Sequence, residues 1–367
     1  MMFIWFADSR RVMKHWILIV LLLLGACAQN NESIKVGAIL PLSGTAASAG
    51  ASIAQGMQIA VDETNRQGGI DGRPLELLIE DSKGNPQEAI SAFLSINTQH
   101  DPIAMVSALS AVSMALAPVA QEQNIPLIAT ATTAMNLTND WTFRYYPRTE
   151  DEARVMQDIL QRLDVKTLAI LHLNDEFGVS IAKELSSQFK GKIVIEAFEG
   201  KTQEFETQVL KLQDAKPDAL LIVGFASHII KAAKTADTLG FKGAILAPST
   251  ASSPEVRDAV KNLELYAPAS RIYDSGLEAN TERFISEYEH ATNHSVDHYA
   301  AAGYDVMRMV AKTSEEATSP DEFRDELNTM DFEGILGSSR HEGHEYAFPL
   351  YPSLVSNGRV DFLSEND

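Results

Sequence analysis

Short apolar runs alternate with amphipathic segments from Ile34 onward, and this alternation is the feature that most limits the possible folds. The run Ile34–Leu40 has the length of one buried strand, whereas apolar residues in 53–64 recur at the spacing of one helix face. Strands that are separated by helices pair in parallel, because the helix returns the chain to the starting edge of the sheet. The pattern therefore predicts an α/β fold.

The alternation runs through the chain twice, which predicts two doubly wound parallel-sheet lobes. In the first set we expect strands at 34–40, 75–79, 103–106 and 126–129. In the second set, which opens with a helix at 150–163, we expect strands at 167–171, 192–198, 219–223 and 244–247. Three helices at 277–292, 298–316 and 321–330 and two strands near 347–355 and 359–363 complete the prediction.

The N-terminal segment has the layout of a bacterial export signal. Basic residues in 10–14 precede the apolar core 16–24, which is too short to span a bilayer as a stable helix. The sequence LGAC that ends at Cys27 resembles a lipobox, which predicts cleavage after residue 26 and a diacylglyceryl group on Cys27. Met13 is a better start for such a signal than Met1. An ordinary secretory signal with a chance cysteine is the alternative.

Composition excludes several classes of protein. The chain has 30 Lys and Arg against 50 Asp and Glu, a net charge of −20, which repels nucleic acid and anionic lipid headgroups. Cys27 is the only cysteine, so no internal disulfide can form. After Cys27 no apolar run approaches bilayer length, and 28–33 is polar enough to serve as a tether. We therefore expect a soluble body whose only membrane contact is a lipid anchor.

Three segments carry a resemblance to a known family: VGAILPLSG at 36–44, NRQGGIDGRPL at 65–75 and EDSKGNP at 80–86. In combination they resemble the leucine/isoleucine/valine-binding proteins of ABC importers. Further similar segments follow at 143–148, 168–172, 177–178 and 217–224, so the resemblance covers essentially the whole chain after the signal. It implies the type I periplasmic-binding fold, in which two lobes joined by three crossover segments close on a small molecule.

The resemblance also implies where the lobes begin and end. The crossovers are expected near Arg148–Asp151, Arg271–Ser275 and Gly334–Arg340. The first lobe then comprises 34–149 plus 276–336, and the second lobe comprises 150–275 plus 337–367.

Two loops of the first lobe match the family's site for a ligand carboxylate. At Ala111 the family's hydroxyl is missing, although Ser110 and Ser113 flank the position. The next loop keeps the expected main-chain groups at Ala131 and the hydroxyl and N–H at Thr133. Backbone N–H groups and hydroxyls beside a helix start can hold an anion without a cation. The alternative is that these residues only cap helices.

Aromatic residues match the apolar walls of the family's cleft. Phe177 and Phe225 stand where the family usually has tyrosines, Tyr299 matches an aromatic position of the first lobe, and Ala49 replaces a further aromatic. Phenylalanine stacks but offers no phenol hydrogen bond, so the body of the ligand should be apolar. Core packing is the alternative for each ring.

Ser249 stands where amino-acid-binding members carry an acid opposite the ligand's α-ammonium. A serine cannot neutralise a buried ammonium, and burying one unpaired costs several kcal/mol. No neighbouring residue is an evident substitute, although Glu255 lies downstream. The sequence therefore favours a ligand that is a carboxylate with an apolar or aromatic tail and no ammonium. An amino-acid-like ligand remains the alternative.

Other chemistry finds little support in the sequence. HEGHE at 341–345 is not HExxH, and on the expected crossover it indicates a solvated loop, with a weak surface metal site as the alternative. Ser48 and Ser187 lack the surroundings of a nucleophile, and no Gly-rich phosphate loop or dinucleotide fingerprint is present. We therefore predict no enzyme activity, no cofactor and no metal.

The expected function is ligand binding outside the cytoplasm. A lipid-anchored, monomeric solute-binding protein would close on one small ligand and pass it to an ABC permease, on either the outer or the inner membrane. The first alternative is a sensory lipoprotein that signals to a membrane receptor through the same closure. The second is an envelope scaffold that binds no ligand.

Overall fold

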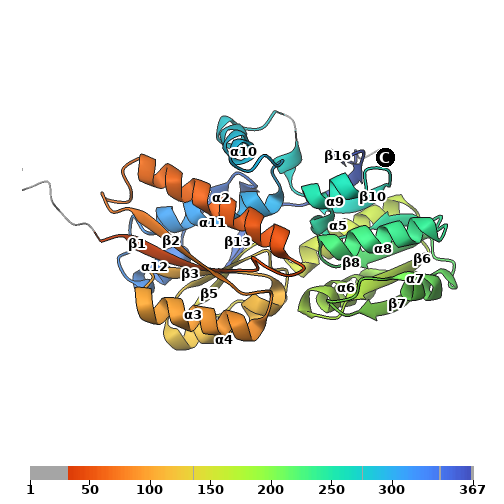
Figure 1. The fold of residues 1–367 in the computed structure, drawn as a ribbon, viewed down its shortest axis with the longest axis horizontal. Helices are drawn as coiled ribbons and strands as arrows, with labels where there is room; N and C mark the ends of the chain where they lie inside the picture. The colour runs from red at the N-terminus through yellow and green to blue at the C-terminus, as the bar shows by residue number, and fades with distance from the viewer. Residues whose placement is uncertain (1–31, 135, 275, 339, 365–367) are drawn as a thin grey trace, which may run out of the picture.

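The computed structural model describes residues 32–134, 136–274, 276–338 and 340–364. The predicted signal, Cys27 and most of the predicted tether lie outside these residues. Within the described part of the chain, no helix is both long and apolar enough to cross a membrane. Figure 1 shows two α/β lobes arranged along the long axis of the molecule, which confirms the predicted fold class.

The first lobe is built on a seven-stranded sheet with the order β13-β14-β5-β4-β3-β1-β2. Every neighbouring pair is parallel except β13 and β14 at one edge. The central strands are almost continuously apolar because helices cover both of their faces. The strands are β1 (Ile34–Leu40), β2 (Leu75–Asp81), β3 (Ala104–Ala108), β4 (Leu127–Thr130), β5 (Thr142–Tyr145), β13 (Arg340–Glu342) and β14 (Glu345–Ala347).

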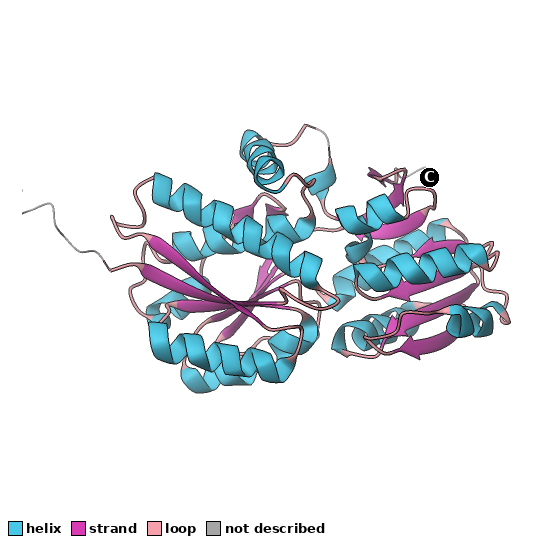
Figure 2. Cartoon of the chain, viewed as in Figure 1, coloured by secondary structure: helices cyan, strands magenta, loops and turns pink. Residues whose placement is uncertain are grey.

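Helices lie on both sides of this sheet, as Figure 2 shows. In α2 and α11 the backbones approach closely: a Cβ at Gly56 would lie 1.9 Å from the Ala300 carbonyl oxygen, and one at Gly303 would lie 2.3 Å from that of Ile53. Only glycine permits this contact. The helices of the lobe are α2 (Ala47–Arg66), α3 (Pro86–His100), α4 (Ser110–Gln123), α10 (Ala279–Thr292), α11 (His298–Thr313) and α12 (Pro320–Leu327). A short ribbon pairs β11 (Glu333–Gly334) with β12 (Gly337–Ser338).

The second lobe repeats the plan with a sheet of order β16-β15-β10-β9-β8-β6-β7, in which β15 pairs antiparallel with both β10 and β16. Its strands are β6 (Thr167–Leu173), β7 (Lys192–Phe198), β8 (Ala219–Val223), β9 (Ala244–Leu246), β10 (Leu265–Ala269), β15 (Tyr351–Ser356) and β16 (Arg359–Phe362). Its helices are α5 (Thr149–Arg162), α6 (Glu176–Gln188), α7 (Glu206–Gln213), α8 (Ala226–Thr238), η1 (Ser249–Ser252), α9 (Pro254–Ala259) and η2 (Arg271–Tyr273).

The third crossover lies later in the chain than the sequence indicated. The prediction placed it at Gly334–Arg340 and assigned 337–367 to the second lobe, but β13 and β14 belong to the first sheet, so the chain crosses between β14 and β15. The cause is a long-range contact: β14 pairs in parallel with β5, and Arg144 Nε lies 2.6 Å from Glu345 Oε2. The segment HEGHE is therefore not the exposed crossover loop that we expected.

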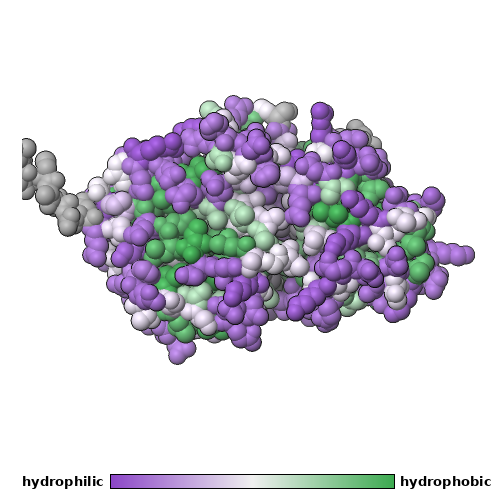
Figure 3. Space-filling view, in the orientation of Figure 1, coloured by the Kyte–Doolittle hydropathy of each residue, from purple (hydrophilic) through white to green (hydrophobic). Residues whose placement is uncertain are grey.

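The two lobes touch across the cleft between them. The Tyr299 hydroxyl of α11 donates to Thr250 Oγ1 of the second lobe at 3.2 Å, and Ser48 Oγ of α2 donates to Glu255 Oε2 at 2.5 Å. Phe225 of the second lobe packs against an apolar cluster of the first. Figure 3 shows a mostly hydrophilic surface in this view, with apolar atoms gathered on the first lobe between α2 and α3. Because the two lobes touch at these points, the cleft between them is closed.

Candidate functional site

A small cavity lies between the lobes, where the loops after the parallel strands face one another, as expected for a doubly wound sheet. Its cavity volume is only about 20 Å³ in this closed arrangement. We call it the inner cavity. Its lining residues are Leu109, Ser110, Ala131, Thr133, Tyr146, Glu152, Phe177, Phe225, Ser249, Thr250 and Tyr299.

One end of the inner cavity carries hydroxyl groups of the first lobe. The backbone N–H of Thr133 donates to Ser110 Oγ at 3.3 Å. The Thr133 side chain is only 2% exposed, and its hydroxyl has no hydrogen-bond partner among the described residues. Leu109 and Ala131 both have positive φ, at 77° and 47°, a strained conformation that is concentrated at functional sites. This end of the cavity can therefore donate a hydrogen bond to an acceptor group of a ligand.

Two pairs of aromatic rings form the walls. Phe177 and Phe225 of the second lobe stack with ring centres 5.9 Å apart and planes 16° from parallel. Tyr146 and Tyr299 stack at 6.5 Å and 6°. The walls are therefore flat and mostly apolar, and they suit a ligand body without charge.

The second lobe contributes an acid that the sequence analysis missed. Glu152 of α5 is fully buried, its Oε1 accepts from the Ser249 hydroxyl, and its Oε2 accepts from the Ser249 N–H at 3.2 Å. No Lys, Arg or His of the described residues pairs with it. Burial raises the pKa of the Glu152 carboxyl to about 7, despite the hydrogen bonds from Ser249.

Glu152 corrects the interpretation of Ser249. By sequence alone, this serine indicated the loss of the acid that faces a ligand ammonium. In the structure, it donates hydrogen bonds to a carboxylate at the cavity wall. A weak signal was present, because Glu152, Val155, Met156 and Ile159 share one helix face and all four are buried. An acid on the apolar face of a helix needs a partner there.

The structure brings together seven of the nine predicted ligand-binding residues: Ser110, Ala131, Thr133, Phe177, Phe225, Ser249 and Tyr299. The other two do not line the inner cavity. Ser113 Oγ bonds instead to Ser107 Oγ at 2.9 Å and to Thr132 Oγ1 at 3.0 Å, and so joins the ends of β3 and β4. Ala111 is half-buried in the first turn of α4.

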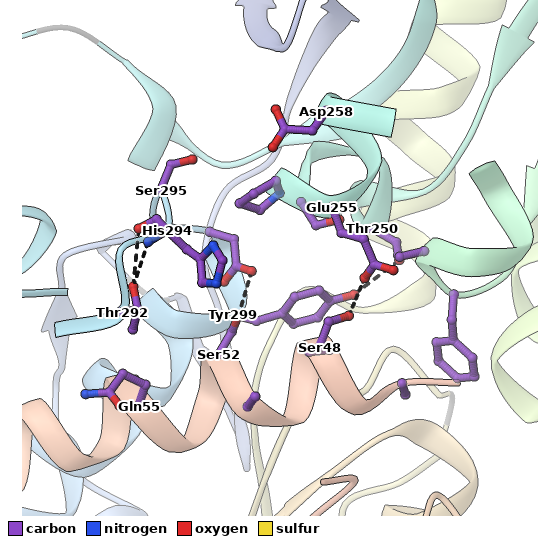
Figure 4. A pocket seen from close by; sticks show the side chains of 18 of the residues that line it. Ser48, Ser52, Gln55, Thr250, Glu255, Asp258, Thr292, His294, Ser295 and Tyr299 are labelled. Atoms are coloured by element: carbon purple, nitrogen blue, oxygen red, sulfur yellow. Dashed lines mark hydrogen bonds between the residues drawn. The ribbon is translucent and has the colours of Figure 1, made fainter. Parts of the chain in front are cut away.

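A second, larger space with a volume of about 520 Å³ lies beside the inner cavity, and we call it the outer chamber. Phe225, Thr250 and Tyr299 line both spaces. Figure 4 shows Ser48 and Ser52 of α2 on one side of the outer chamber and Glu255 on the other. Ala49 and Glu255 lie here, away from Ser249, so Glu255 is not the acid that replaces the family's ammonium partner.

The segment 341–345 forms part of the first lobe's sheet. Glu345 makes a two-point ion pair with Arg144, and His344 Nδ1 contacts the Asn139 carbonyl oxygen. In the described part of the chain, no group of three or more His, Cys, Asp or Glu could hold a metal ion.

The chain is similar in sequence to known binding proteins. The sequence profile of the family described as periplasmic binding protein matches residues 33–358. The chain is 26% identical over 319 residues to a "Leu/Ile/Val-binding protein homolog 7" of Brucella melitensis, covering 79% of this chain and 80% of the relative. It is 27% identical over 209 residues to the "Chemotactic signal transduction system substrate-binding protein BasB" of Halobacterium salinarum, covering 53% and 50%.

A solved structure has the same fold. The branched-chain amino acid transporter substrate binding protein LivJ of Streptococcus pneumoniae, in complex with isoleucine, superimposes with a TM-score of 0.83 at 26% identity, covering 89% of this chain and 97% of that one. The match covers both lobes. The resemblance seen in the sequence is confirmed, and the chain belongs to the periplasmic binding protein family, as a member of the leucine/isoleucine/valine-binding type.

Proposed function

We propose that the protein is an extracytoplasmic solute-binding protein that closes on an α-amino acid and delivers it to an ABC importer. The observation that carries this proposal is the pairing, in one cavity, of the unpartnered Thr133 hydroxyl with the buried, uncompensated Glu152 carboxylate. The ligand's carboxylate would accept a hydrogen bond from the Thr133 hydroxyl, and its ammonium would neutralise the Glu152 carboxylate. Glu152 thus removes the reason to prefer a ligand without an ammonium.

The relatives support a binding role over catalysis. Their names describe substrate binding, and the LivJ structure was solved with isoleucine, a zwitterion with an apolar side chain. In this chain the stacked rings of Phe177 with Phe225 and Tyr146 with Tyr299 would flank the ligand between its two charged groups. The ligand, the permease partner and the monomeric state belong to the proposal.

Replacing Thr133 by alanine tests the carboxylate end of the site. The hydroxyl bond to a charged group contributes roughly 1.5–3 kcal/mol, so leucine should bind about ten- to a hundredfold more weakly to Thr133→Ala than to the parent protein. Calorimetry on protein freed of ligand by unfolding and refolding measures the difference. Thr138→Ala, outside the inner cavity, is the matched control and should bind as the parent does. Equal affinities of Thr133→Ala and the parent would reject the placement of the carboxylate.

Lipid anchoring is the second part of the proposal, and it depends on Cys27. Cys27→Ser should move the protein from the membrane fraction to the aqueous fraction. Its unfolding temperature should be unchanged, because the chain has no second cysteine and thus no disulfide to lose. Fractionation of cells that express each form measures the change. The anchor proposal fails if both forms fractionate alike.

A sensory role is the second candidate. It is favoured by one observation, the similarity to a substrate-binding protein of a chemotactic signal transduction system. Closure on a ligand serves a receptor as well as it serves a permease, so the same ligand cleft supports both roles. A non-binding scaffold, in contrast, would require a cleft that takes up no ligand.

A further inference from the structure

The partition between the inner cavity and the outer chamber is thin. Phe225, Thr250 and Tyr299 face both spaces, and the Tyr299 hydroxyl reaches Thr250 through a single hydrogen bond of 3.2 Å. Both partners are neutral hydroxyls, and either can take a ligand group or a water as its new partner. The two spaces are therefore adjacent and share part of their lining.

The outer chamber is negatively charged. Glu255, Asp258 and Asp297 line it, and His294 is the only basic side chain among its lining residues in the described chain. Asp297 is buried and accepts from Ser52 Oγ at 2.9 Å, and Glu255 accepts from Ser48. These partners are neutral hydroxyls, so neither bond cancels the charge. The Arg257 guanidinium does not line the chamber, but it partly offsets the negative charge of Asp297.

The chamber also contains an unsatisfied polar group and ample room. The Ser253 side chain lines it, the residue is only 6% exposed, and its hydroxyl has no hydrogen-bond partner among the described residues. On the opposite side, α2 and the residue before it present small side chains, namely Ala46, Ser48, Ala49 and Ser52. Ala49 is the position where the family resemblance led us to expect an aromatic ring. Its absence leaves the space open.

We propose that the two spaces form one site, and that the protein binds an amino acid whose long side chain passes Tyr299 and ends in a cation within the outer chamber. This inference rests on the proposed function, because it takes the ligand's carboxylate and α-ammonium to lie at Thr133 and Glu152. It assigns the ligand to the lysine and arginine class rather than to the branched aliphatic class. The distal cation pairs with the carboxylates, and its N–H groups supply donors to the Ser253 hydroxyl.

Lysine and norleucine give the direct comparison, since they have the same carbon chain and differ in the terminal ammonium. Lysine should bind roughly twofold to fivefold more tightly to the ligand-free parent protein, because ion pairs with exposed acids such as Glu255 and Asp258 contribute about 0.2–1 kcal/mol. The double variant Glu255→Gln/Asp258→Asn should bind lysine about as weakly as norleucine, with norleucine unchanged. The variant Glu80→Gln/Glu122→Gln removes the same charge from exposed positions away from the chamber, and should keep the preference for lysine.

Each outcome separates this inference from the proposed function. If norleucine binds at least as tightly as lysine, and Glu255→Gln/Asp258→Asn changes neither affinity, the cationic ligand is rejected while an amino-acid site stands. If no amino acid binds, the proposed function fails and this inference fails with it. Thermal unfolding of the ligand-free variants shows whether a variant with weakened lysine binding is still folded. The control variant Glu80→Gln/Glu122→Gln should keep the parent's midpoint of unfolding.

Discussion

Glu152→Gln is expected to weaken the binding of an α-amino acid such as leucine or lysine by roughly a hundredfold to several thousandfold. Removing one partner of a buried charge pair typically costs about 3–5 kcal/mol, because the other charge stays buried without compensation. Glutamine has nearly the same volume as glutamate, so the loss of affinity measures the effect of removing the charge. Calorimetry on ligand-free protein measures it.

The matched ligand for this experiment is 4-methyl-2-oxopentanoate, which has the carbon skeleton of leucine and no ammonium. The parent protein should prefer leucine, and Glu152→Gln should reverse or abolish that preference. At pH 8 the ligand-free variant should be at least as stable as the parent, because the substitution removes a buried carboxylate that has no cationic partner. Unchanged leucine affinity in the variant would show that Glu152 does not face the ammonium.

Amino-acid binding is expected to weaken by about fiftyfold between pH 7 and pH 5. Glu152 has a pKa of about 7 in the ligand-free protein, so it is increasingly protonated below that pH. An ammonium requires the ionised form, and binding must then expel a proton, which costs about a factor of ten for each pH unit below the pKa. Calorimetry across this range measures the dependence.

The stability of the ligand-free protein should move in the opposite direction. The folded-state pKa of Glu152 lies above its value of 4.5 in an unfolded chain. The contribution of Glu152 to stability is therefore fully present below pH 4.5 and is lost as the pH rises through 7, by roughly 3 kcal/mol. Burial also raises the pKa of Asp297 and of Asp305 to about 6, so the test is the difference between the parent and Glu152→Gln. If both forms show the same pH profiles, Glu152 is not the titrating group.

The sequence predicted the regular parts of the fold well. The strands Ile34–Leu40 and Lys192–Phe198 have the predicted bounds, because each is a single run with its own local signal. The strand Leu265–Ala269 was missed. It is short, and Pro268 within it is an unfavourable signal for a strand that pairs on both sides.

The position of the third crossover depends on tertiary contacts. The strands Arg340–Glu342 and Glu345–Ala347 are short and contain polar residues, with no periodicity that marks a strand. Their place in the first sheet depends on pairing with β5 and on the ion pair between Arg144 and Glu345, about two hundred residues apart in sequence. No local pattern contains that information.

The sequence by itself determined the two-lobed α/β architecture, and the family resemblance indicated the hydroxyl and aromatic parts of the cleft, because these depend on local runs and motifs. Only the tertiary structure showed which acid lies at the wall of the inner cavity. Three consecutive acids open the helix at 149–162, a common arrangement at a helix start, and the sequence does not single out Glu152 by charge. Packing against Ser249, 97 residues later, buries this one carboxylate and leaves its charge without a cation, because burial depends on contacts between distant parts of the chain.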